Sequence, residues 1–255
     1  MGYKRTIFIS GNRLRFIYTL FFLTVIFLLL ISFSKLILRT VIQAHCPTVV
    51  IDAGHGGIDG GAVRGDVMEK DINLSISLMV QSYLEQNDMN VIMTRSEDIS
   101  LEKLVNNGDS RHSRDLKARA QIINHSHAQI FTSIHVNSNV NNPSASGSYV
   151  FYNETRSGSQ KLAYMIQRQL NSMYISDKKR TIHDPQKGNY YLLVNGKIPG
   201  VIVETAFLSN QEEFGLLKTS EYHQALAQAI ANGICEYFEE IRRVYNVQIA
   251  PESVK

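Results

Sequence analysis

The sequence is poor in cysteine. It contains two, Cys46 and Cys235, which lie 189 residues apart in a chain of 255 residues. They do not form a C-x-x-C pair, the spacing typical of paired-thiol motifs. One disulfide between the two residues and two separate thiols are both consistent with the sequence. In either case the stability of the folded part should come from its hydrophobic core.

The sequence also lacks internal repeats, low-complexity tracts and, beyond its first 44 residues, any excess of basic side chains. Those first 44 residues contain six Lys and Arg and no acidic residue. The remaining 211 contain 20 basic and 23 acidic residues, a formal balance of −3. The basic overall charge therefore comes from the N-terminal segment, and a basic surface for nucleic acid is excluded. The part that remains is long enough for one globular domain with an ample core.

One long hydrophobic run is present, near the N-terminus. Residues 16–34, FIYTLFFLTVIFLLLISFS, contain no charged side chain. A helix of this length reaches about 28 Å, close to the thickness of a bilayer core. Four Lys and Arg residues precede the run, so we expect a cytoplasmic basic stub and export of the remainder. A cleaved signal and a membrane anchor both fit. We therefore predict a leader with a short linker over 1–44, a folded domain over 45–245 and a tail over 246–255.

The stretch VVIDAGHGGIDGGAV, residues 49–63, places one histidine among glycines at the end of an apolar run. Glycines in such loops often cradle phosphate, but neither G-x-G-x-x-G nor Gly-Lys-Ser/Thr fits the spacing here. Asp52, Asp59 and Asp66 would also repel phosphate. A nucleotide loop is therefore excluded, and we expect a strand that opens into a flexible loop carrying His55.

Along the rest of the domain, apolar spacing alternates between that of helices and that of strands. Strands are expected over 48–52, 90–94, 129–134, 148–152, 190–194 and 200–205. Helices are expected over 71–88, 114–124, 157–173 and 220–243. This alternation favours an α/β fold, a single domain with a mostly parallel or mixed twisted sheet and helices on both faces.

Four polar residues, far apart in the sequence, fall near the carboxyl ends of predicted strands. His55 follows the first strand and His135 follows the third. Glu204 lies near the end of the last strand, and Glu69 precedes the first helix. Ligands gather at this edge of α/β sheets, so we expect the four to converge. Two imidazoles and a carboxylate can hold catalytic zinc, while a second carboxylate acts as general base and acid. Spacing alone does not decide which glutamate binds the metal.

Each candidate residue also admits a simpler structural role. Glu69, in MEKD, could serve only as an acidic residue that favours a helix N-terminus. Glu204 ends an apolar strand, where a buried carboxylate is costly without a partner, and this favours a functional role. Among the other histidines, we expect solvated helix-end positions for His125 and His127 and loop positions without an identified partner for His112 and His183.

Three motifs in combination resemble the zinc-dependent N-acetylmuramoyl-L-alanine amidases of the amidase-3 type. They are IDAGHGG with Glu69 about fourteen residues on, SIHVNS, and VETAFLSN. The resemblance covers about residues 47–240. It implies that His55, Glu69 and His135 bind one Zn²⁺ ion. It also implies that Glu204 is the catalytic carboxylate, which decides between the two glutamates. The implied reaction is hydrolysis of the amide between N-acetylmuramic acid and L-alanine of the stem peptide in peptidoglycan.

Two longer stretches, SRDLKARAQIIN and YYLLVNGKIPGVIVETAFLSN, look like the germination-specific cortex amidases of spore formers. This resemblance implies a role in spore cortex maturation, where stem peptides are removed so that a deacetylase can form muramic lactam. A vegetative cell-wall amidase or autolysin, a zinc carboxypeptidase, a partner-dependent enzyme and a non-catalytic wall-binding module are the alternatives. The expected location is extracytoplasmic, either anchored to the membrane or secreted into the cell-wall or forespore space.

Overall fold

The computed structural model describes residues 11–44, 46–175 and 178–249. The chain divides into two compact units, Met1–Cys46 and Pro47–Lys255. Of the predicted tail over 246–255, the first four residues continue the last helix, and the rest lie outside the described residues. The start of the predicted basic stub, residues 1–10, also lies outside them.

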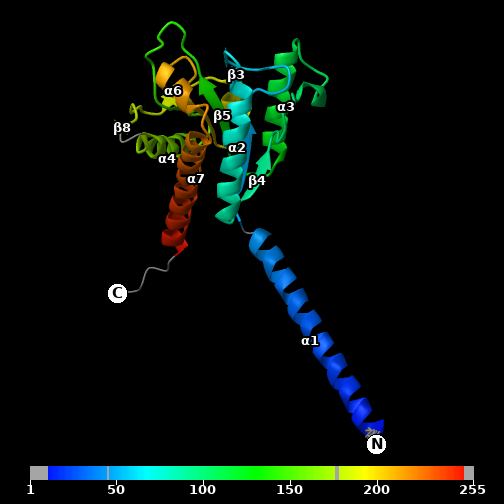
Figure 1. The fold of residues 1–255 in the computed structure, drawn as a ribbon. Coiled ribbons are helices and arrows are strands. Elements are labelled where there is room, and N and C mark those ends of the chain that lie inside the picture. The colour runs from blue at the N-terminus through cyan, green and yellow to red at the C-terminus, as the bar shows by residue number, and fades with distance from the viewer. Residues whose placement is uncertain (1–10, 45, 176–177, 250–255) are drawn as a thin grey trace, which may run out of the picture. The chain divides into compact units, whose positions relative to one another are not determined.

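The first unit contains helix α1 (Gly11–Ala44), drawn in blue in Figure 1. This helix includes the hydrophobic run over 16–34 that the sequence predicts as a signal or anchor. Within the described residues, no helix is both long enough and apolar enough to cross a membrane.

The second unit is built on a six-stranded sheet with the strand order β4-β1-β5-β10-β6-β9. Its strands are β1 (Thr48–Ala53), β4 (Asn90–Met93), β5 (Ile130–Asn137), β6 (Tyr149–Tyr152), β9 (Gln186–Lys187) and β10 (Gly200–Phe207). Strands β4, β1, β5 and β10 are parallel, β6 runs antiparallel to β10, and β9 runs parallel to β6. The carboxyl ends of the four parallel strands therefore lie at one edge. The predicted α/β class with a mixed sheet is confirmed.

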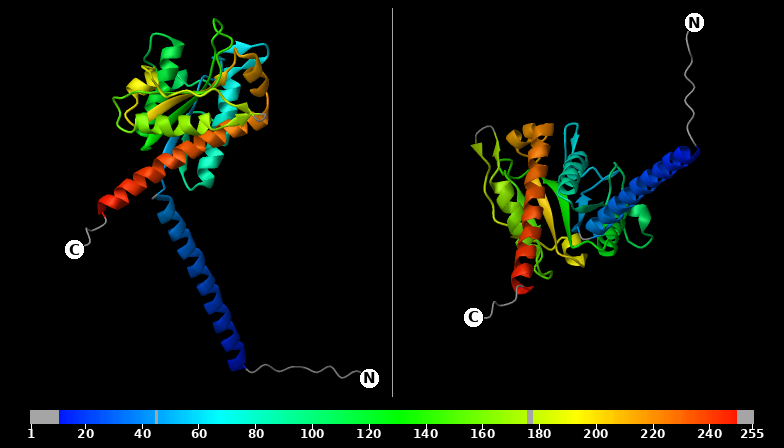
Figure 2. Two further views of the ribbon diagram at one scale, coloured as in Figure 1. Left: turned by 90° about the vertical axis from the view of Figure 1, so that its left-hand side faces the viewer. Right: turned by 90° about the horizontal axis from the view of Figure 1, so that it is seen from below.

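Three helices cover one face of this sheet, and Figures 1 and 2 show α7 packed beside its neighbours. They are α2 (Glu69–Gln86), α4 (Ser159–Asn171) and α7 (Ser220–Ile249). Helical spacing explains how they pack: in α2, Ile72, Ile76 and Val80 recur every four residues and are all buried. They share the larger hydrophobic core with Val49 and Ile51 of β1.

Two helices, α3 (Arg111–His125) and α5 (Tyr191–Asn195), lie on the opposite face. Ile123 of α3 and Leu192 of α5 form a second, smaller core with Val50 and Phe131. Successive side chains of a strand point to opposite faces, so Val50 enters a different core from its neighbours in β1.

Strand β6 shows the same alternation, but one of its faces is less covered. Val150 and Tyr152 are buried in the larger core. Tyr149 and Phe151, on the face that carries α3 and α5, remain partly exposed. The helical covering of this second face therefore thins out toward β6.

The predicted strand over 190–194 is wrong, because this segment forms helix α5. The N–H of Val194 donates to the carbonyl of Tyr190 at 3.0 Å, and that of Gly196 donates to Leu192 at 2.8 Å. Aromatic and branched side chains favour a strand locally. However, the consecutive residues Leu192 and Leu193 both enter the smaller core, which a strand would not allow.

Other element boundaries also differ from prediction. His135 lies inside β5 and not after it, because pairing with β10 continues to Asn137. His112 lies in the first turn of α3, which begins three residues before the predicted helix. Short elements that the sequence did not predict are β2 (Val63–Arg64), β3 (Val67–Met68), η1 (Glu102–Leu104), β7 (Tyr174–Ile175), β8 (Lys178–Lys179), β9 (Gln186–Lys187) and α6 (Gln211–Leu216). Cys235, in α7, carries a free thiol.

A buried ion pair joins β1 to α3 beneath the loop that carries His55. Asp52 is fully buried, and its Oδ1 accepts hydrogen bonds from Arg119 and from Thr94, each at 2.6 Å. Its Oδ2 accepts one from Ser133 at 2.5 Å. Burial alone would raise the pKa of Asp52, but Arg119 and the two hydroxyls outweigh it and lower that pKa to about 2.

We predict that Asp52→Asn lowers the free energy of unfolding by about 3 to 5 kcal/mol at neutral pH, because it leaves the Arg119 guanidinium buried without its counter-charge. In the wild type, the stabilisation from the depressed pKa is complete above about pH 4 and is lost as pH falls toward about 2. Urea unfolding of the full chain at a series of pH values measures both effects.

Asp66→Asn is the matched control, because Asp66 is exposed in a turn. It should leave both the stability and its pH dependence unchanged. Equal stability of the two variants would contradict the assigned role of the ion pair. So would a free energy of unfolding that falls as steeply at low pH in Asp52→Asn as in the wild type.

Candidate metal centre

The centre begins at the loop that follows β1. His55 has a left-handed backbone with φ of 59°, which is uncommon for a residue with a side chain. Two guanidinium groups donate hydrogen bonds to backbone carbonyls of this loop. Arg119 donates to the carbonyls of Ala53 at 2.7 Å and His55 at 2.5 Å, and Arg95 donates to those of Ala53 and Gly54, each at 2.9 Å. The sequence predicts this loop to be flexible, but these hydrogen bonds hold its backbone in place.

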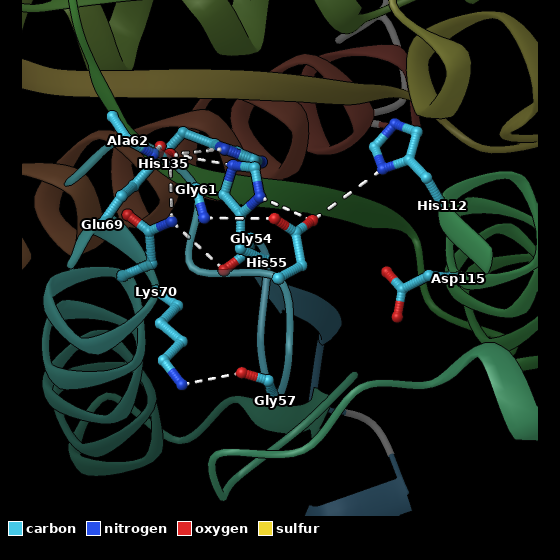
Figure 3. Close-up of polar contacts among 12 residues, drawn as sticks. Gly54, His55, Gly57, Gly61, Ala62, Glu69, Lys70, His112, Asp115 and His135 are labelled. Atoms are coloured by element: carbon cyan, nitrogen blue, oxygen red, sulfur yellow. Dashed lines mark hydrogen bonds and ion pairs between the residues drawn. The ribbon is translucent and has the colours of Figure 1, made fainter.

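Three predicted ligands lie together at this loop, and Figure 3 shows them turned toward one another. Oε1 of Glu69 lies 3.2 Å from Nε2 of His55 and 3.0 Å from Nδ1 of His135. One ligand atom from each residue can be chosen so that all three lie within 4.8 Å of one another. The structure thus brings together side chains from the β1 loop, the start of α2 and strand β5.

Glu69 is held in place by donors from three directions. It is the first residue of α2 and is 5% exposed. Its Oε2 accepts a hydrogen bond from the N–H of Ala62 at 2.8 Å. Its Oε1 accepts bonds from the N–H of Val136 at 3.2 Å and the side chain of Asn73 at 3.3 Å. Its position agrees with a favourable contact to the helix dipole, but the dipole alone does not account for the two imidazoles that it faces.

His55 has a second carboxylate partner, Asp59, which the sequence analysis treated only as a charge that repels phosphate. Its Oδ2 lies 3.0 Å from Nδ1 of His55, and its Oδ1 accepts a hydrogen bond from the N–H of Gly61 at 3.1 Å. His112 of α3 approaches the same Oδ2 at 3.8 Å (Figure 3). A carboxylate on one ring nitrogen fixes the ring and makes the other nitrogen a better metal ligand.

Two glycines leave room for these side chains. A Cβ added at Gly54 would lie 2.3 Å from Cε1 of His135. A Cβ added at Gly61 would lie 2.6 Å from Oε2 of Glu69 and 2.8 Å from Cδ2 of His55. These two glycines therefore allow a close approach of the backbone to the side chains of the predicted ligands.

Glu204 lies beside His135 in the register of β10 and β5. It lines the same pocket as the three predicted ligands, together with Tyr190 and Ile202. Its Oε2 is buried and has no hydrogen-bond partner within the described part of the chain. Burial raises the pKa of Glu204 to about 7; the charge of His135 opposes this shift. A carboxylate with such a pKa can accept a proton and return it near neutral pH.

The charges of the predicted ligands depend on one another. Burial disfavours a charged His55, but Glu69 and then Asp59 outweigh it and raise the pKa of His55 to about 9. Burial also opposes the charge of Glu69, yet hydrogen bonds from His135 and His55 keep the pKa of Glu69 well below its usual range. A cation that binds here must therefore displace a proton.

The residues present fit a zinc ion. Two imidazoles and one carboxylate are a donor set typical of catalytic zinc, which keeps a further position open for water. The donor atoms converge, His55 has its supporting carboxylate, and an unpartnered oxygen of Glu204 lies in the same pocket. The individual roles of the four residues stay predictions.

Four other histidines that the sequence analysis considered are not among the three that converge. His125 and His127 are exposed near the end of α3. His183, expected to have no identified partner, stacks on Tyr149 with ring centroids 3.9 Å apart. His112 also has a partner, the Asp59 carboxylate.

The sequence of this chain is similar to known peptidoglycan enzymes. The family model described as N-acetylmuramoyl-L-alanine amidase (Amidase_3) matches residues 49–236, which include all four predicted site residues. The germination-specific N-acetylmuramoyl-L-alanine amidase of Bacillus subtilis is 38% identical over 195 residues, covering 75% of this chain and 80% of that protein. The amidase LytC of the same organism is 33% identical over 195 residues, covering 75% of this chain and 35% of that protein.

A solved structure agrees with these matches. The CwlD amidase from Clostridioides difficile, solved in complex with the GerS lipoprotein, is similar with a TM-score of 0.68 at 37% identity. The similarity covers 76% of this chain and 98% of that one. The resemblance seen in the sequence motifs is confirmed.

We predict that Gly61→Ala lowers zinc affinity about ten-fold or more, because the new Cβ pushes Glu69 and His55 out of position. Gly65→Ala is the matched control. Gly65 has φ of 62°, close to the 65° of Gly61, but a Cβ there would meet nothing within 4 Å. Both variants carry the same backbone strain, so only the contact with the ligands differs. Competition with a chromophoric chelator measures the affinity, and equal zinc binding by the two variants would contradict the assignment.

Proposed function

Because this chain belongs to the N-acetylmuramoyl-L-alanine amidase family, we propose that it is a zinc-dependent peptidoglycan hydrolase. It cleaves the amide that joins N-acetylmuramic acid to L-alanine of the stem peptide. One observation carries this proposal: His55, Glu69 and His135 line a single pocket with Glu204, a carboxylate whose Oε2 has no partner in the described residues.

The residues divide the reaction between them. His55, Glu69 and His135 would hold the ion, which would supply a Lewis acid and lower the pKa of a bound water. Glu204 would accept a proton from the water that attacks the amide carbonyl and pass it to the nitrogen of the leaving L-alanine as the C–N bond breaks. A buried carboxylate oxygen without a hydrogen-bond partner suits both transfers, because the carboxylate must be free to take the proton and then able to give it up.

The names of the relatives support a sporulation role. One relative is called a germination-specific amidase, and a similar structure was solved with a lipoprotein. We propose that this chain acts in the extracytoplasmic space on spore cortex, with the basic, hydrophobic N-terminal segment directing export. A lipoprotein partner that acts on this chain is part of the same proposal. A vegetative amidase is the second candidate, supported by the similarity to LytC.

We predict that the full chain releases intact stem peptides from purified peptidoglycan and that a chelator abolishes the release. Glu204→Gln should retain zinc, because Glu204 is not a ligand, yet lose about a hundred-fold or more in rate. Mass analysis of the fragments and metal analysis of the protein check these outcomes.

Glu240→Gln is the control, because Glu240 pairs with Lys161 on the surface of α7 and α4. It should cleave as the wild type does. Full turnover by Glu204→Gln would remove Glu204 from the mechanism. Release of single amino acids from the end of the stem peptide would indicate a carboxypeptidase.

The sporulation role has its own test. In the cortex of spores that lack this chain, we expect muramic lactam to be absent, because the peptide must leave before the lactam can form. Chromatography of digested cortex measures the lactam. An unchanged lactam content would favour the vegetative role while leaving the amidase activity intact.

A further inference from the structure

The catalytic residues belong to a row of side chains that crosses the sheet. His135 of β5 pairs with Glu204 of β10, and Glu204 pairs in turn with Tyr149 of β6. Two residues earlier on β10, Ile202 pairs with Phe151. Cross-strand neighbours on one face lie about 5 Å apart at their Cβ atoms, so Tyr149 stands directly beside the catalytic carboxylate. On the β6 side of the predicted metal ligands, the side chains on this face of the sheet are therefore aromatic.

Four rings form this region, which we call the aromatic shelf: Tyr149, Phe151, His183 and Tyr190. Phe151 lies 5.1 Å from Tyr190 and 6.2 Å from Tyr149, and Tyr149 stacks on His183 at 3.9 Å between centroids. Tyr190 lines the catalytic pocket itself and is 42% exposed, while the other three are partly exposed. The shelf therefore starts inside the pocket and continues outward along β6.

The side of the candidate metal centre that lies away from β6 is lined by different side chains. Beyond His55 a second pocket, of about 130 Å³, opens next to the first turn of α3. Its lining consists mostly of charged or titratable side chains: Asp59, Glu102, Arg111, His112 and Asp115, with Ser100 and Ile58. Asp59 connects this pocket to the metal centre through its contact with His55.

The substrate of the proposed amidase also has two halves that differ in chemistry. On one side of the cleaved bond is a sugar ring, whose C–H faces pack well on aromatic faces, because those faces carry negative charge and shed water readily. On the other side is a peptide, whose amide and charged groups form hydrogen bonds with polar side chains and offer no such face. Both halves must lie within a few bonds of the catalytic pocket.

We propose that the aromatic shelf binds the glycan strand and that the stem peptide extends toward α3. This inference rests on the proposed function, since it assigns an orientation to that substrate. The shelf is longer than one sugar ring, so it contacts the muramic acid and the sugar next to it. Tyr190 and His183, at its two ends, are specificity-determining residues for glycan.

Two substrates separate sugar binding from chemistry. One is a disaccharide muropeptide, and the other is the same stem peptide carrying only a lactoyl group, which preserves the cleaved amide but lacks the sugar. For Tyr190→Ala and His183→Ala in the full chain, we expect the ratio of kcat/KM for the first substrate over the second to fall about ten-fold. Tyr190→Phe should keep the wild-type ratio because the ring remains.

Tyr164→Ala is the matched control, since Tyr164 is 58% exposed on α4, away from the shelf. Its ratio should equal that of the wild type. A ratio unchanged in both shelf variants would overturn the proposal. So would an equal fall in turnover of both substrates, since that pattern indicates a general effect on the fold or the chemistry.

A binding experiment tests the shelf independently of the proposed function. Glycan strands stripped of stem peptides should sediment with the wild-type chain and with Tyr164→Ala, but weakly with Tyr190→Ala. If the chain cleaves neither substrate, the proposed function fails while this result still decides the inference. Absence of glycan binding by the wild type, or equal binding by Tyr190→Ala, would overturn the shelf.

Discussion

The buried contact between Arg119 and Asp52 is the constraint on which the site depends. It occupies the space directly under the end of β1, and the same guanidinium reaches the carbonyls of Ala53 and His55. A left-handed histidine is unfavourable by itself, so the backbone keeps this conformation only where its surroundings demand it. Once His55 is fixed, its ring meets Glu69 on one side and Asp59 on the other. The ion pair thus positions the candidate metal centre without contacting the side chain of a predicted ligand.

The parallel sheet explains how residues so far apart in sequence form one site. Each of three neighbouring strands delivers one functional side chain at its carboxyl end: β1 through the loop with His55, β5 with His135 and β10 with Glu204. The antiparallel strand β6 continues the row with Tyr149. Side chains around the site change in kind from charged groups near α3, past the candidate metal centre, to aromatic rings at β6, and the orientation proposed above for the substrate rests on this difference.

The sequence predicted much of this arrangement, for reasons that the structure makes clear. The tendency of ligands to gather at the carboxyl ends of strands in α/β sheets was sufficient to group His55, Glu69, His135 and Glu204. The motif resemblance implied which of the two glutamates binds the metal. The α5 helix was missed because burial of Leu192 and Leu193 in one core overrides the strand preference of the neighbouring residues Tyr190, Tyr191 and Val194.

The supporting residues were harder to predict: Arg95 and Arg119 bind backbone carbonyls of a distant segment, and Asp59 meets His55 only because the loop folds back on itself. The position of Arg119 does indicate a buried ion pair. It lies in a helix between Ala118 and Ala120, which are buried, and a buried charge requires a partner. Arg95 and Asp59 carry no such signal, since each stands in a polar stretch and gains its role only through the fold.

The most direct test of the account is a crystal structure of the zinc-loaded full chain with anomalous scattering measured at the zinc edge. The account predicts one ion bound by His55, Glu69 and His135, with Glu204 facing it unbound. An ion held by other residues, or these three side chains turned away from one another, would contradict it.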